Sequence, residues 1–263
     1  MGRGRSKVSS GNSGNRTNAP TRANTPSGVS VEQFSAMSMD EKVNTINSIV
    51  SDSNITVPSY LDRSETSKVL YALGMNNKPT VVDDATLSSM SGIEIFRTVY
   101  EGDSMPPPSS QDIADQIRHG DYTQLSGVGG SAHGRALYFA TDFNDSAGYG
   151  GGEKNALIMR SKINPSAKIA KETSLFGNNR NDPEFVNFAQ KANVNTRDAM
   201  ALYALSKGID GWYSNSYTMI INRGAITMSS QNKSITTNGQ NKRGGLKPGS
   251  AWARSWDTAM NMK

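Results

Sequence analysis

The chain contains no cysteine and only two histidines among its 263 residues. Disulfide bonds, thiolate catalysis and thiolate metal sites are therefore excluded. The compartment is left open, because a chain without cysteine folds in oxidising and reducing surroundings alike. Two histidines are also too few for a histidine-rich metal site.

Long apolar runs are missing as well. No stretch approaches the roughly 18 apolar residues that span a bilayer, and the mean hydropathy of -0.56 fits a soluble chain. Basic residues near the N-terminus are not followed by the apolar segment of a secretory signal peptide. We expect no membrane partner.

Acidic side chains are nearly absent from both ends. Residues 1–28 are polar and basic, which predicts a disordered basic arm, and residues 230–263 form a second basic tail with Trp252 and Trp256 one helical turn apart. The net charge of +5 allows contact between these tails and a polyanion. Plain solvated tails remain the simpler interpretation.

Two regions are expected between the tails. Residues 29–90 read as a small helical region, with a capping box at Ser38 to Glu41, a second helix from about Ser64 and a third near residues 84–90. Packing or partner docking is its simplest role. Residues 91–229 mix short strands with helices, such as one opened by Ser109 and Asp112 and another capped by Thr196, and this predicts an α+β fold.

An arginine interrupts the apolar side of the first strand in this region. Residues 93–100 alternate as a β-strand and place Arg97 on the face shared with Ile95 and Val99. An arginine among apolar strand positions indicates an anionic ligand. The alternative is a guanidinium that reaches solvent along its aliphatic stem.

Aromatic residues follow a glycine-rich approach farther along. His133 and Gly134 lead into the apolar run from Leu137 to Ala140, which predicts a buried strand. Asp142 or Asn144 can cap a short helix over residues 145–149, which would turn Tyr149 back toward Tyr138 so that the two rings sandwich a flat ligand. The alternative is a strand and turn whose aromatic rings are only core material.

These segments, together with a Gly208-Ile209-Asp210-Gly211-Trp212 turn and a final strand from Tyr217 to Ile226, resemble the phage-encoded members of the ADP-ribosyltransferase superfamily. The resemblance implies catalytic roles for Arg97, Tyr138 and Tyr217. It implies that NAD is bound by a set made of Arg97, Thr98, His133, Gly134, Tyr138, Phe139, Ser146 and Tyr149.

Two positions depart from the pattern of the family. Thr98 stands where the family has glycine, and Tyr217 stands where it has its catalytic glutamate, with no glutamate anywhere after Glu184. Asp210 is the nearest acidic substitute, although its place also suits a turn residue.

The resemblance implies an α+β fold with a split β-sheet core, NAD as a substrate and no metal. The expected activity is mono-ADP-ribosylation of a host protein or nucleic acid, in the host cytoplasm during infection, with packaging in the virion as a further option. Two alternatives stay open, which are an NAD glycohydrolase that uses the same pocket and a catalytically inactive virion structural or nucleic-acid-associated protein.

Overall fold

A computed structural model describes residues 25–57, 64–75, 78–101, 109–119, 135–149, 155–215 and 217–234. Structural statements below concern these residues. Most of the expected arm at 1–28 and of the expected tail at 230–263 lies outside them, as do His133, Gly134, Trp252 and Trp256.

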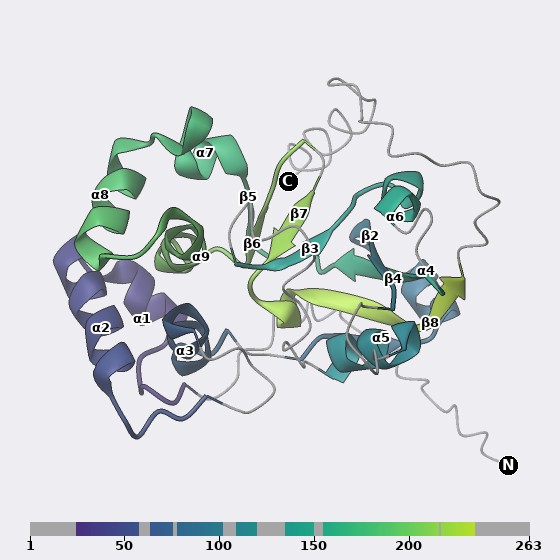
Figure 1. Cartoon of the computed structure of the whole chain (residues 1–263), viewed down its shortest axis with the longest axis horizontal. Coiled ribbons are helices and arrows are strands. Elements are labelled where there is room, and N and C mark those ends of the chain that lie inside the picture. Colours follow the sequence, from purple (N-terminus) through teal and green to yellow (C-terminus); the bar gives the residue numbers. More distant parts are fainter. Residues whose placement is uncertain are drawn as a thin grey trace, which may run out of the picture.

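Helices from two separate stretches of the chain, residues 31–72 and 172–206, gather on one side of the molecule (Figure 1). They are α1 (Val31–Ala36), α2 (Met39–Ser51), α3 (Glu65–Ala72), α7 (Glu172–Phe176), α8 (Pro183–Ala192) and α9 (Thr196–Ser206), with a 3-10 turn at Asn178–Arg180. The capping box between Ser38 and Glu41 is confirmed at the start of α2, and Ser64 caps α3.

The cap of α9 differs from the prediction. Asn195, not Thr196, is the N-cap, and its side-chain oxygen accepts hydrogen bonds from the backbone N–H groups of Arg197 and Asp198 at 3.1 Å. Both residue types suit this position, but Asn195 has the extended backbone of a cap while Thr196 is already helical.

The first sheet has the order β1-β8-β4-β2. Its strands are β1 (Thr80–Val82), β2 (Ile93–Val99), β4 (Leu157–Ile163) and β8 (Ile226–Ser234). Only the β1–β8 pair is parallel. The helices α4 (Asp84–Ser89) and α5 (Ser110–His119) pack against it, and the predicted cap between Ser109 and Asp112 opens α5.

The second sheet has the order β3-β7-β6-β5. It contains β3 (Leu137–Phe139), β5 (Ile169–Lys171), β6 (Gly211–Tyr213) and β7 (Thr218–Ile220). A single bridge joins the sheets, where the backbones of Phe96 and Ala140 exchange two hydrogen bonds of 2.7 Å. Helix α6 (Phe143–Tyr149) follows β3. The α+β class is thus confirmed.

The final strand of the prediction is two strands. β7 ends at Ile220, a 3-10 turn follows at Arg223–Ala225, and the chain then enters β8 in the other sheet. Asn222 bends the chain there, because its side-chain oxygen accepts a hydrogen bond from the Gly224 N–H at 3.2 Å.

Two apolar clusters hold the molecule together. The helical cluster joins α1–α3 to α8 and α9, so it crosses the boundary expected at residues 90 and 91. The sheet cluster lies between α5 and the strands. The helices α1–α3 are short and present their apolar faces to α8 and α9, which complete their core. β1 and α4 pack on β8 instead, and β8 continues past the boundary expected at 229 and 230.

Candidate functional site

Arg97 lies on β2 between the buried side chains of Ile95 and Val99, on the face that the sequence predicts. One guanidinium nitrogen donates a hydrogen bond of 2.8 Å to the backbone carbonyl of Tyr138. Its Nε is buried and has no hydrogen-bond partner within the described part of the chain. Burial lowers the pKa of Arg97 to about 10, so the side chain stays cationic at neutral pH. A buried cation with an unused donor is suited to an anion.

Thr98 points to the opposite face of β2 and anchors α6. Its hydroxyl contacts the backbone carbonyl of Ser146 and lies 3.0 Å from the Ser146 hydroxyl. Ser146 is buried. Asp142 caps the start of the same helix, since its carboxylate accepts hydrogen bonds from the N–H groups of Asn144 and Asp145. Thr98 and Ser146 therefore fix the first turn of α6 on the strand that carries Arg97.

The aromatic residues divide between the two clusters. Tyr138 and Tyr217 are partly buried against the helical cluster, whereas Phe139 is buried in the sheet cluster. In the β3–β7 register Phe139 pairs with Thr218, which places Tyr217 beside Ala140, the residue that bridges to β2. Tyr149 is the last residue of α6, and its side chain lies outside the described part of the structure, as do His133 and Gly134.

Segments far apart in the sequence thus meet at the junction of the two sheets. Arg97 contacts the backbone of Tyr138, Thr98 contacts Ser146, and Tyr217 lies next to the bridging strand. Strand alternation directs the side chains of Arg97 and Phe139 to one face, and those of Thr98 and Tyr138 to the other.

Asp145 is an acidic residue of this junction for which no role was predicted from the sequence. Its Oδ2 is buried without a hydrogen-bond partner among the described residues. Burial, and after it the charge of Asp142, raise the pKa of Asp145. Burial and the Asp145 carboxylate raise the pKa of Tyr217. The Asp145 carboxylate and the Tyr217 phenol therefore interact electrostatically, and both side chains are partly buried.

Asp210, by contrast, holds a turn. It is buried, and its carboxylate accepts hydrogen bonds from the Asn222 side chain at 2.7 Å and from the Lys168 N–H at 2.9 Å. Its own carbonyl accepts from the N–H groups of Ile221 and Asn222. These contacts tie β5 and β6 to the end of β7, so the carboxylate is already engaged in the fold.

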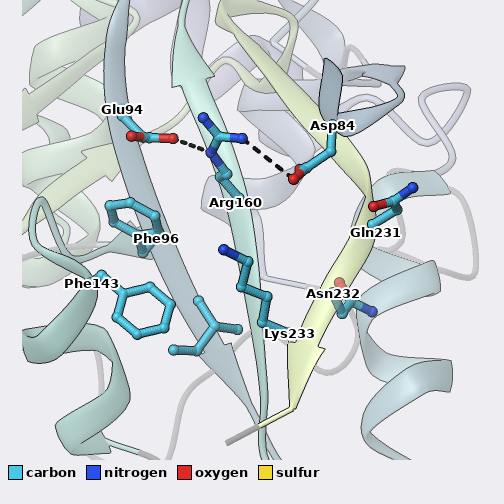
Figure 2. Close-up of a pocket in the computed structure, with 9 residues that line it drawn as sticks. Asp84, Glu94, Phe96, Phe143, Arg160, Gln231, Asn232 and Lys233 are labelled. Atoms are coloured by element: carbon cyan, nitrogen blue, oxygen red, sulfur yellow. Dashed lines mark hydrogen bonds and ion pairs between the residues drawn. The ribbon is translucent and has the colours of Figure 1, made fainter. Parts of the chain in front are cut away.

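A separate cavity of about 350 Å³ lies on the Phe96 face of the first sheet, beyond α6 (Figure 2). Its lining comes from α4, α6 and three strands, namely Asp84, Glu94, Phe96, Phe143, Ile158, Arg160, Gln231, Asn232 and Lys233. We name it the β2–β4–β8 pocket. None of the residues expected to bind NAD lines it. Its members are scattered along the chain in no recognisable motif, so only the strand register could have revealed them.

The two cations of this pocket differ in their contacts with acidic side chains. Arg160 contacts the Glu94 carboxylate, lies 3.5 Å from the Asp84 carboxylate and donates to the Ser88 hydroxyl at 2.9 Å. Lys233 instead lies over the Phe143 ring, 5.9 Å from its centroid. The Phe143 ring meets Phe96 edge to face, with centroids 5.7 Å apart.

Within the described ranges, no cluster of three or more acidic or histidine side chains is arranged to hold a metal ion. No helix there has the length and apolar character needed to cross a membrane. The chain matches no protein-family model, and no curated protein and no solved structure matches it.

Proposed function

We propose that this protein binds NAD, breaks the bond between nicotinamide and ribose, and transfers ADP-ribose to a host macromolecule. The observation that carries the proposal is that the strands of Arg97, Tyr138 and Tyr217 and the helix of Ser146 come together at the junction of the two sheets. These residues come from segments that the sequence relates to one family. The presence of two sheets, joined at Phe96 and Ala140, supports the split β-sheet core that this resemblance implies.

Arg97 supplies the anion-binding group. Its charge and its unused Nε donor suit a phosphate oxygen of the dinucleotide, and a guanidinium binds such oxygens in a fixed geometry. Its hydrogen bond to the Tyr138 carbonyl holds it beside the strand whose tyrosine would face the nicotinamide ring.

Asp145 supplies the carboxylate that position 217 lacks. When the glycosidic bond breaks, nicotinamide leaves with the bonding electron pair and positive charge develops at ribose C1′. A carboxylate fixed close to C1′ stabilises that charge. The acceptor nucleophile then bonds to C1′ and releases its proton, for which the Asp145 carboxylate, with its raised pKa, is a suitable base.

The inactive transferase fold is the second candidate. It is favoured by Tyr217, which occupies the position of the usual glutamate, and it predicts a protein that keeps the fold and loses the reaction. An NAD glycohydrolase is the same chemistry with water as the acceptor.

A thermal shift with NAD and an assay of released nicotinamide separate these candidates. We expect the intact chain to be stabilised by NAD and to release nicotinamide, and Arg97→Ala and Tyr138→Ala to lose both effects. Arg197→Ala, an exposed arginine, and Tyr71→Ala, which like Tyr138 is partly buried against the helical cluster, are matched controls. If saturating NAD gives neither a shift nor nicotinamide, the proposal is wrong.

A further inference from the structure

The β2–β4–β8 pocket offers a flat aromatic wall. Phe143 is 39 % exposed, which is uncommon for so large an apolar side chain, and Phe96 supports it edge to face. The buried Ile158 also lines the pocket. A partly exposed aromatic ring beside an apolar side chain is suited to stacking with a planar ring.

Lys233 provides a cation at the same place. Figure 2 shows its side chain extending into the space between Phe96 and Arg160. Arg160 is engaged by Glu94 and Asp84, whereas Lys233 has no acidic partner among the described residues and lies over the Phe143 ring. A bound anion would therefore meet Lys233 without breaking an ion pair of the fold.

Gln231 adds hydrogen-bonding capacity beside Lys233. Its side chain is exposed and lines the pocket. The neighbouring Asn232 carboxamide is occupied, since it bonds to Arg118 and Gln111. This carboxamide lies on β8, across the pocket from Phe96 and Phe143 (Figure 2), and offers both a donor and an acceptor to a polar edge of a bound nucleotide.

We propose that the β2–β4–β8 pocket binds one nucleotide of a single-stranded nucleic acid, with the base against Phe143 and the phosphate at Lys233. The volume of about 350 Å³ lies within the range of small-ligand sites. Its aromatic, amide and ammonium groups match base, base edge and phosphate.

The pocket also connects to the reaction site through α6. Phe143 begins this helix, and Asp145 lies on its first turn. The inference that this nucleic acid is the ADP-ribose acceptor rests on the proposed function. The nucleophile is then an amino or hydroxyl group of the nucleic acid, which gives up its proton when it bonds to ribose C1′.

Binding is tested first, without NAD. The full chain is titrated into a fluorescent single-stranded oligonucleotide at fixed salt, with Phe143→Leu and Lys233→Gln as variants. Each variant should weaken binding about tenfold, the scale of losing one stacked base or one phosphate contact. Lys78→Gln removes the same charge from another exposed position and should change binding much less. Adenosine 5′-monophosphate should compete, whereas inorganic phosphate should not.

The test separates this inference from the proposed function. The pocket assignment is wrong if the oligonucleotide does not bind, or if Phe143→Leu and Lys233→Gln leave its binding unchanged. Either result leaves the proposed function standing, because nicotinamide release is measured separately. Once release is established, label from NAD should be removed from the product by nuclease and not by protease. Label that only protease removes overturns the acceptor assignment.

Discussion

At the scale of single residues, the ionised carboxylate of Asp145 is expected to lower the stability of the fold and to increase the rate of nicotinamide release. Its pKa is raised, mainly by burial, so the folded state favours the protonated carboxyl. For a carboxyl group whose folded pKa lies above its unfolded value, the stabilising contribution is present below the unfolded pKa and is lost as the pH rises through the folded pKa. At neutral pH the ionised group therefore destabilises the fold.

Asp145→Asn is accordingly expected to raise the melting temperature at pH 7 slightly, because solvent screens the partly exposed carboxylate. The gain should disappear as the pH falls below the ordinary aspartate pKa of 3.8. The same variant should still bind NAD. It should release nicotinamide at least about a hundredfold more slowly than the intact chain. Thermal melts across pH and the release assay measure both effects.

Asp40→Asn is the control, since the Asp40 side chain is 73 % exposed on α2. It should change neither quantity. A variant at Asp145 that releases nicotinamide at the rate of the intact chain would remove Asp145 from the mechanism.

Sequence periodicity was sufficient to place Arg97, because its neighbours Ile95 and Val99 alternate with polar residues along a strand. Sequence periodicity could not predict the role of Asp145. That role depends on how Thr98 and Ser146 dock α6 on β2, a contact between distant segments.

At the scale of elements, the turn before β6 stabilises the fold. Asp210 and Asn222 are buried and bonded to each other, and Asp210 also receives the Lys168 N–H. Asp210→Ala should lower the free energy of unfolding by about 2–4 kcal/mol, because it leaves buried donors without an acceptor. Denaturation with urea measures the loss.

Asp210→Asn keeps one side-chain acceptor and should be folded and active under mild conditions. A stable, folded Asp210→Asn protein that binds NAD without releasing nicotinamide would instead identify Asp210 as a reacting group and weaken the role given to Asp145.

Local signals predicted many elements but not all of them. The capping residues Ser38, Ser64 and Ser109 each mark a helix that forms. α8 was not predicted, although Asp182 before Pro183 is a readable start. The split of the last strand into β7 and β8 depends on Asn222 and its buried partner, which no local pattern reveals.

At the scale of the whole molecule, the helical cluster makes one unit of segments that the sequence assigns to separate regions. α1–α3 bury their apolar faces against α8 and α9, from the other side of the expected boundary. The composition of residues 29–90 predicted helices correctly. It could not predict their packing partners, because the apolar face of a short amphipathic helix does not specify which other element packs against it.

Phe34→Ala is therefore expected to destabilise the entire described fold. Phe34 is fully buried in α1 within the helical cluster, and removing such a ring costs about 3–5 kcal/mol. Unfolding followed by circular dichroism and by protease cleavage in β4 or β8 should shift together. Val186→Ala, at an exposed position of α8, should shift neither. Loss of the helical signal alone, with the strands still protected, would show two independent units.

The most direct test of the central claim is transfer of labelled ADP-ribose from NAD into a bacterial lysate. The intact chain should incorporate label, Arg97→Ala, Tyr138→Ala and Asp145→Asn should not, and the exposed Arg197→Ala should behave as the intact chain. Failure of the intact chain to incorporate label or to release nicotinamide would contradict the account and favour the inactive fold.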